Sequence, residues 1–400
     1  MFQLTNKPWL WLSTLLFLFL SLNQAFPQLN YSLTFDHQYN SNPFRLPETE
    51  ASADHISQFG AGLRYNWEKM SLQYFGNYAR FSENSLRNFY WQQLYFTGGD
   101  STNWFVSAEN RINRQEYNLY DYFTLQAGLN HVFHSGNFLM RLGSNLSINT
   151  FRQLEELNNF TFNGYFSLSR SFQTRTSFFG TLSFKYRTYL NQPLIPVVTG
   201  DTLSDMNLSV SSIDGMGGRG QGFGTNPYYL PESETPSLAQ MVLSFRVAQS
   251  LAKFTGVALQ YTNRFSFSSQ DRNIVGLIDG FSEESQIFDD PMGYQGQTVG
   301  LEFTQIFPWR LVLKTNGYWQ SKNYISQGIY LDPENYSELT LRQDTYKAFL
   351  VTLQKSWDFK FPALGALTLQ LNYQWIDNRS NSYWYDYKNS YFSTGIGFDF

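Results

Sequence analysis

Along most of the chain, hydrophobic and polar residues alternate with a period of two. From Ala366 to Ile376 the residues at odd-numbered positions are Leu, Leu, Leu, Tyr and Trp, and those between them are Thr, Gln, Asn and Gln. The same alternation recurs in 239–247, 160–168 and 138–149. Successive side chains of a β-strand point to opposite faces, so the pattern predicts strands with one apolar and one hydrated face.

Strands of this kind fill the chain after its first residues. We predict sixteen of them, at 28–38, 57–67, 69–80, 88–97, 102–113, 121–133, 136–150, 157–170, 174–189, 237–251, 254–267, 296–307, 309–321, 345–357, 365–378 and 390–400. The segment 88–97 shows the weakest alternation, because both of its faces are aromatic.

The connections between these segments sort by length. Links after even-numbered segments are short, whereas links after odd-numbered segments are longer and polar, at 39–56, 81–87, 114–120, 151–156, 190–236, 268–295, 322–344 and 379–389. Short turns at one end and long loops at the other, with an even strand count, are the layout of an outer-membrane barrel with periplasmic turns and extracellular loops.

A soluble β-sandwich is the alternative. It would also alternate, but its turns would not sort in this way, and its strands are usually about 5–6 residues long. A bilayer needs about 9–11 tilted residues per strand, which the segments provide. We therefore predict an all-β fold, a single transmembrane up-and-down antiparallel β-barrel of about sixteen strands over residues 26–400, with both termini periplasmic.

The first 25 residues form a different kind of segment. Lys7 precedes an apolar stretch from Trp9 to Leu22, which is typical of a secretory signal peptide. A membrane anchor is the competing interpretation, but the stretch is shorter than the ~20 residues of a spanning helix. We predict a signal peptide over residues 1–25, cleaved after Ala25.

The last predicted strand runs from Tyr391 to Phe400, with Phe392, Ile396, Phe398 and Phe400 on one face. It resembles the C-terminal signature of Gram-negative outer-membrane β-barrels. The resemblance implies an outer-membrane location and recognition of the Phe400 strand by the barrel-assembly machinery. The stretches 40–45 and 383–387 also resemble parts of porin-like barrels, including those of surface-lipoprotein assembly modifiers.

Composition supports this class and excludes others. Aromatic residues make up 19% of the chain and charged residues 15%, which excludes a disordered chain. The absence of cysteine excludes disulfides and thiolate metal sites, and a net charge of −4 offers no basic surface for nucleic acid. Aromatic rings concentrate at bilayer interfaces, and six tryptophans lie near predicted strand ends: Trp67, Trp104, Trp309, Trp319, Trp357 and Trp375.

The hydrated faces predict the lining of the lumen. They carry the basic residues Arg64, Arg111, Arg141, Lys185, Arg187, Arg246, Arg264, Arg310 and Lys314, and the acids Asp36, Glu109, Glu302 and Asp399. Arg or Lys facing lipid would cost about 2–4 kcal/mol, which alone places them inside. They are either members of an interior network or a set that gives a pore a preference for anions.

Two long loops offer further candidates. The loop 190–236 contains the stretch 215–220, a literal match to a dinucleotide fingerprint outside any βαβ unit, which we attribute to chance. It either folds into the lumen as a constriction, with Arg219 at the opening, or stays on the surface. The loop 268–295 is acidic, and we expect a solvated loop rather than a Ca²⁺ site, because calcium-loop spacing is absent.

The sequence assigns no catalytic, cofactor-binding or metal-binding residue. His131 and His134 flank a predicted turn without a third ligand, and no serine motif of a hydrolase occurs in a strand-turn-helix setting. The leading hypothesis is a porin-like channel for small polar or anionic solutes. Its alternatives are a barrel for export or surface assembly and an outer-membrane lipid hydrolase. The expected partners are outer-membrane lipid, the barrel-assembly machinery and further copies of the chain in a homo-oligomer, with no nucleic acid.

Overall fold

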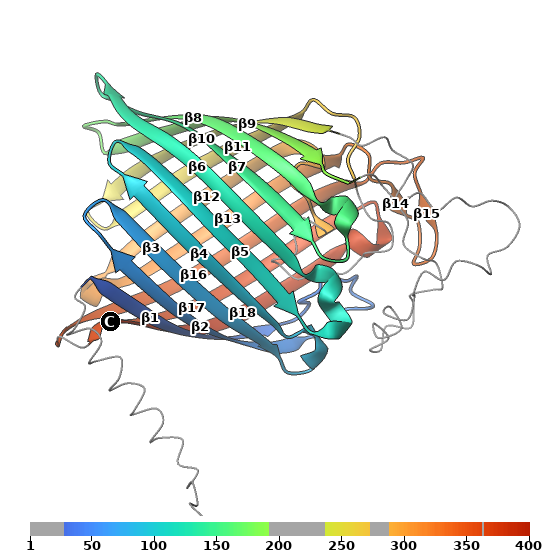
Figure 1. Ribbon diagram of the computed structural model, residues 1–400, viewed down its shortest axis with the longest axis horizontal. Coiled ribbons are helices and arrows are strands. Elements are labelled where there is room, and N and C mark those ends of the chain that lie inside the picture. The colour runs from blue at the N-terminus through green and yellow to red at the C-terminus, as the bar shows by residue number, and fades with distance from the viewer. Residues whose placement is uncertain (1–27, 192–236, 273–287, 362–363) are drawn as a thin grey trace, which may run out of the picture.

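The computed structural model describes residues 28–191, 237–272, 288–361 and 364–400, and in them the chain forms a closed antiparallel barrel of sixteen strands (Figure 1). The barrel strands are β1 (Leu29–Asn40), β2 (Asp54–Asn66), β3 (Met70–Phe81), β4 (Phe89–Gly99), β5 (Thr102–Asn113), β6 (Tyr122–Ser135), β7 (Phe138–Phe151), β8 (Asn159–Ser171), β9 (Thr176–Tyr189), β10 (Ser237–Ala252), β11 (Thr255–Ser266), β12 (Tyr294–Phe307), β13 (Leu311–Tyr324), β16 (Gln343–Phe361), β17 (Leu364–Ser380) and β18 (Tyr387–Asp399). The prediction of a sixteen-stranded barrel is confirmed.

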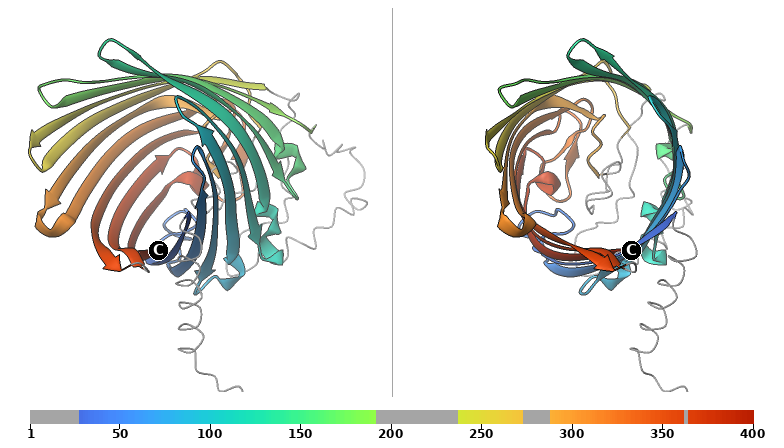
Figure 2. Two further views of the ribbon diagram at one scale, coloured as in Figure 1. Left: turned by 60° about the vertical axis from the view of Figure 1, so that its left-hand side comes forward. Right: turned by 90° about the vertical axis from the view of Figure 1, so that its left-hand side faces the viewer.

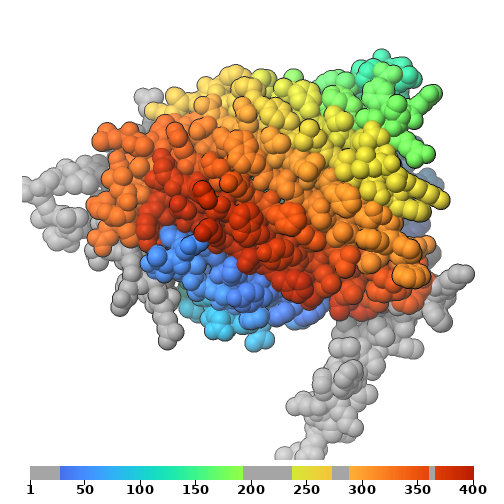
Figure 3. All heavy atoms as spheres, turned by 180° about the vertical axis from the view of Figure 1, so that it is seen from behind, coloured from blue at the N-terminus to red at the C-terminus, as the bar shows by residue number. Residues whose placement is uncertain are grey.

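Each strand pairs with its neighbours in the ring, and the first strand pairs with the last. Ser32 of β1 lies opposite Asp399 of β18, and the register continues to Asn40 opposite Tyr391. The space-filling view shows these two ends of the chain side by side on the outer wall (Figure 3). β13 pairs directly with β16, because β14 (Ile329–Tyr330) and β15 (Tyr336–Ser337) form a separate hairpin.

The predicted sorting of the links by length is also confirmed. The long links contain the short 3₁₀ helices η1 (Ser85–Arg87), η2 (Gln115–Tyr120), η3 (Glu155–Leu157) and η8 (Tyr383–Tyr385), whereas η7 (Pro308–Arg310) lies in a short turn. We call the two ends of the barrel the long-loop end and the short-turn end. No helix among the described residues is long and apolar enough to cross a bilayer.

The outer face of the wall is apolar, as the alternation requires. Leu142, Leu259 and Leu301 are 57%, 55% and 60% exposed, although they lie in the middle of their strands. Alternate positions hold the polar residues that face the lumen, such as Gln260 beside Leu259. Such a ring buries its apolar side chains only when lipid covers them.

This assignment of faces predicts the result of moving a charge. Replacing Leu259 with arginine is expected to destabilise the barrel by about 2–4 kcal/mol, because the guanidinium would then face hydrocarbon. The control is Gln260→Arg, which places the same charge one residue away on the lumen side. Equal unfolding free energies of the two variants in lipid vesicles would contradict the assignment of faces.

The buried side chains gather at the long-loop end rather than along the wall. They form clusters around Tyr120, Ile56, Leu238 and Tyr385, at the strand ends and in the long loops. The fold therefore combines a water-facing interior with a packed mouth. These two regions contain the candidate site.

Candidate functional site

The structure places most of the predicted basic residues on lumen-facing strand positions. Arg64 lies on β2, Arg141 on β7, Lys185 and Arg187 on β9, Arg246 on β10, Arg264 on β11 and Lys314 on β13, with Glu302 on β12 and Arg111 on β5. Arg310 lies in the turn helix η7 rather than in a strand, and its well-exposed guanidinium pairs with Asp358. Arg219, the loop 192–236 and residues 1–27 lie outside the described residues.

Three of these lumen-facing cations contact neighbouring side chains: Arg187, which pairs with Asp290, Arg246 and Arg111. The guanidinium of Arg246 donates to Glu302 Oε2 through Nη2 at 2.7 Å and through Nε at 3.2 Å. Arg111 is only 2% exposed, and its guanidinium lies 3.9 Å from the centre of the Phe89 ring. Arg246 is thus neutralised, whereas Arg111 packs into the wall.

Five of the predicted cations form no ion pair with any residue in the described part of the chain: Arg64, Arg141, Lys185, Arg264 and Lys314. Lys185 and Arg264 lie on the two strands that flank β10. Lys185 of β9 is opposite Gln240 of β10, and Arg264 of β11 is opposite Val242 of β10. Their like charges therefore face the lumen close together.

The wall of β3 to β5 carries aromatic side chains on the lumen side. The rings of Phe75 and Trp91 lie 5.7 Å apart, and those of Tyr95 and Phe105 lie 5.5 Å apart. This explains why the segment 88–97 alternates weakly: both of its faces need rings, one for lipid and one for the lumen. Elsewhere, Tyr165 lies against Gly143, where a Cβ would come within 2.5 Å of the ring.

The hairpin β14–β15 and η8 extend over part of the mouth at the long-loop end, and we call them the cover. Seen along the barrel, both lie within the ring of strands, and the side view places them at this end (Figures 1 and 2). We call the side chains that join them the mouth cluster: Phe288, Tyr330, Trp384 and Tyr385. Trp384 Nε1 donates to the carbonyl of Pro333 at 3.1 Å. Because Pro333 lies in the turn between β14 and β15, this bond holds η8 to the hairpin.

Three buried ion pairs lie at this end of the barrel, beside the hairpin and η8, and we call them the charged anchors: Arg342–Asp344, Lys322–Asp289 and Arg187–Asp290. The first is the most deeply buried, with side-chain exposures of 1% and 0%. The guanidinium of Arg342 donates to both oxygens of Asp344 at 3.0 and 2.5 Å. It also lies 3.4 Å from the centre of the Tyr385 ring, so it connects the wall to the mouth cluster.

The other two charged anchors hold the segment 288–293 against the barrel. Lys322 and the hydroxyl of Tyr324, both on β13, donate to the carboxylate of Asp289. Burial alone would raise the pKa of Asp289, but Lys322 and Arg342 hold it below its usual range. Asp289 is therefore ionised, as its partners require.

Asp271 lies beside the third charged anchor. Its carboxylate accepts from the Tyr189 hydroxyl at 3.0 Å, and Gly293 makes room for it, since a Cβ there would be 2.2 Å from Oδ2. Burial and the nearby charge of Asp290 raise the pKa of Asp271 from 3.8 to about 7, although Arg187 acts in the opposite direction.

These contacts correct the expectation for the acidic loop 268–295. Asp271, Asp289 and Asp290 are not solvated on a rim but are held by Tyr189, Lys322 and Arg187. The basic partners Lys322 and Arg342 were not among the predicted site residues, because both lie in the segment 322–344 that was predicted to be a loop. The apolar residues around the acids, Phe288, Pro291 and Met292, are the signal of burial in the sequence.

The raised pKa of Asp271 predicts a pH dependence of the mouth. The closed mouth binds this proton more tightly than an open one, so closure is favoured most below about pH 4 and loses that advantage as the pH rises through 7. Hydrogen exchange in residues 325–342 is expected to be faster at about pH 8 than at about pH 5, after correction for the intrinsic rate. Asp271→Asn should remove most of the difference. A pH effect unchanged in this variant would assign it to another group.

Comparison with known proteins adds information on the fold. No family model matches the sequence, and no curated protein matches it. OccAB1 from Acinetobacter baumannii has a similar structure, with a TM-score of 0.50, 7% identity, and coverage of 94% of this chain and 97% of that chain.

Two further solved structures are similar. CdiB from Acinetobacter baumannii has a TM-score of 0.50 and 10% identity, and the match covers 93% of this chain and 60% of CdiB. OccK1 (OpdK) from Pseudomonas aeruginosa has a TM-score of 0.48 and 7% identity, with coverage of 94% and 99%. At these identities the likeness is one of fold alone, and the fold is that of a porin-like outer-membrane β-barrel.

Proposed function

We propose that this protein is an outer-membrane channel through which small polar or anionic solutes diffuse, without a covalent step. The observation that carries the proposal is the lining of the lumen. Five basic residues face it without an ion pair among the described residues, Lys185, Arg264 and Lys314 among them, whereas Glu302 is paired with Arg246. The acids Asp36 and Glu109 also lie on lumen-facing positions, so the cations without a partner outnumber them. A basic lining attracts anions and repels cations, and the low-dielectric wall around it concentrates its field in the lumen.

The size of the ring supports passage. Barrels of about 16–18 strands enclose an aqueous channel, whereas eight-stranded barrels are filled by their own side chains. Rings such as that of Tyr165 lie against the wall instead of crossing the lumen. This position is compatible with the aqueous channel that we propose.

The proposal is tested with the purified full chain in planar bilayers. We expect steady ion current and, in a salt gradient, a reversal potential that indicates preference for the anion. A preference for cations would reject the assigned role of the basic residues, and absence of current at any pH or voltage would reject diffusion.

A barrel for export or surface assembly is the second candidate. The observation in its favour is the partly covered mouth, where the mouth cluster and the contact of Arg342 with Tyr385 hold β14–β15 and η8 at the end of the lumen. Under this alternative, current appears only when a partner displaces the cover. Variants that weaken the cover then produce large current from a silent wild-type protein, which distinguishes the two candidates.

A further inference from the structure

A pocket of 380 Å³ opens on the outer wall at the long-loop end of β3, β4 and β5, away from the lumen. It is lined by Tyr78, Asn88, Tyr90, Ile112, Asn113 and Arg114. Tyr78, Tyr90 and Ile112 lie on the lipid-facing positions of their strands, in line with Tyr74, Leu94 and Val106, which are all more than 40% exposed. The pocket therefore lies where the apolar belt ends and the loops begin.

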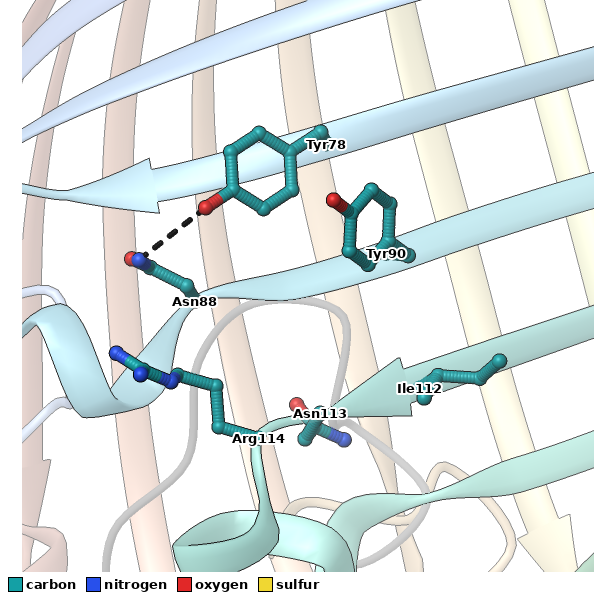
Figure 4. A pocket seen from close by; sticks show the side chains of 6 residues that line it. All are labelled: Tyr78, Asn88, Tyr90, Ile112, Asn113 and Arg114. Atoms are coloured by element: carbon teal, nitrogen blue, oxygen red, sulfur yellow. Dashed lines mark hydrogen bonds between the residues drawn. The ribbon is translucent and has the colours of Figure 1, made fainter.

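The lining combines hydrogen-bond donors with one positive charge. Asn88 Nδ2 donates to the Tyr78 hydroxyl at 3.3 Å, so the proton of that hydroxyl is available to a ligand. The ring of Tyr90 is 60% exposed and lies 4.6 Å from that of Tyr78. Figure 4 shows the Tyr78 hydroxyl directed at Asn88, with the guanidinium of Arg114 extending toward the same side.

Arg114 is held in place but not neutralised. Its Nη1 donates to the carbonyl of Ser85 at 3.2 Å, and it forms no ion pair in the described part of the chain. Asn113, the residue before Arg114, is fixed by Asp121. Oδ1 of Asp121 accepts from the backbone N and from Nδ2 of Asn113, at 2.7 and 3.0 Å. None of the six lining residues is acidic. Arg80, two positions beyond Tyr78 on the outward face of β3, adds a second exposed positive charge.

A second outer pocket provides the contrast. It has a volume of 240 Å³, and Trp375, Lys388 and Glu48 are among its lining residues. Here the charge is cancelled within the pocket, because Lys388 Nζ lies 2.7 Å from Glu48 Oε1. Two pockets at the same end of the barrel thus differ in whether a cation is left for a ligand.

From this geometry we propose that the Arg114 pocket binds the phosphorylated sugar headgroup of a lipopolysaccharide molecule in the leaflet beside the long loops. The guanidinium and the tyrosine hydroxyls would donate to the phosphate, and planar guanidinium groups suit phosphate oxygens well. The acyl chains would continue down the apolar belt over Ile112 and Val106, and the sugar would pack on the exposed Tyr90 ring. A phosphorylated lipid with acyl chains fits both parts of this surface: Arg114 offers a positive charge to the phosphate, and Ile112 and Val106 offer an apolar wall to the chains.

The test measures lipid binding to the full-length barrel in detergent by native mass spectrometry. The probes are lipid A with two phosphates, the same lipid after removal of its phosphates, phosphatidylglycerol and inorganic phosphate. We expect lipid A to bind best and Arg114→Gln to weaken its binding roughly fivefold, a modest factor because water screens a charged contact at an exposed site. Arg114→Lys keeps the charge but lacks the planar guanidinium, so it should weaken binding less than Arg114→Gln does. Lys388→Gln is the control in the charge-cancelled pocket.

The outcomes decide between sources of the phosphate. The proposal would be overturned if wild-type protein and Arg114→Gln bound lipid A equally. It would also be overturned if the wild-type protein bound lipid A equally well with and without its phosphates. Phosphatidylglycerol bound as tightly through Arg114 would also overturn it, since the site would then not select the sugar headgroup. Inorganic phosphate competing on equal terms would show that the acyl wall contributes nothing. Resistance of each folded variant to unfolding by SDS at room temperature excludes loss of the fold as the cause.

Discussion

Replacing Arg342 with alanine is expected to open the mouth, with the largest change in conductance of any single substitution at the long-loop end. Asp344 is fully buried, and the substitution removes the partner of its carboxylate. Breaking a buried ion pair from one side costs about 3–5 kcal/mol, because the remaining charge has neither water nor a counter-ion. The loss also frees the Tyr385 ring, which lies 3.4 Å from the guanidinium. We expect faster proteolysis of residues 325–342 and several-fold higher single-channel conductance.

The chain contains a matched control for this experiment. Lys388 pairs with Glu48 at 2.7 Å at the same end of the barrel, and both side chains are exposed, at 55% and 63%. Exposed pairs contribute about 0–1 kcal/mol, so Lys388→Ala should leave both proteolysis and conductance near those of the wild type. If Arg342→Ala also left them unchanged, the cover would be held by the apolar contacts of the mouth cluster and not by the charged anchors.

The second large effect is expected on ion selectivity. Lys185 and Arg264 are adjacent lumen cations without a carboxylate partner in the described residues, so replacing both with glutamine removes an unbalanced charge of +2 from one side of the wall. We expect the anion-to-cation permeability ratio to fall several-fold, toward unity. The measurement is the reversal potential in a KCl gradient, with conductance recorded alongside to detect a change in pore size.

The Arg246–Glu302 pair tests the same reasoning in the opposite direction. Glu302→Gln leaves Arg246 without its carboxylate and should raise the anion preference, whereas Arg246→Gln frees the carboxylate and should lower it. Because the pair is partly exposed, neither variant is expected to unfold the barrel. Equal shifts of the same sign in both variants would indicate that pore geometry, not charge, sets the selectivity.

The strands could be predicted because the constraint that forms them is local. Each wall residue meets either lipid or water, so the period of two is visible within a single strand; the segment 102–113 coincides with β5. The hairpin β14–β15 escaped prediction, since its strands contain two residues each and cannot show a period. Its position depends on Tyr330 and Trp384, which belong to different loops.

The charged anchors could not be predicted for a different reason. Arg187 and Asp290 meet only after the ring has closed and the intervening segments have folded, and no spacing in the sequence indicates that contact. The facing of Lys185, Arg246 and Glu302 was visible from alternation, but which of them is neutralised was not. That property depends on side chains of different strands at the same height, which register determines.

The seam between β1 and β18 has a consequence for assembly. At this place the barrel joins strands from opposite ends of the sequence, and the ring of Tyr31 stacks on that of Phe400 at 4.9 Å. Before the seam forms, β1 and β18 each present a row of unsatisfied backbone amides, which hydrocarbon penalises by several kcal/mol per group. Insertion must therefore be completed in a concerted step or under the protection of a catalyst. A chain shortened by its final strand would be expected to aggregate rather than form a smaller cylinder.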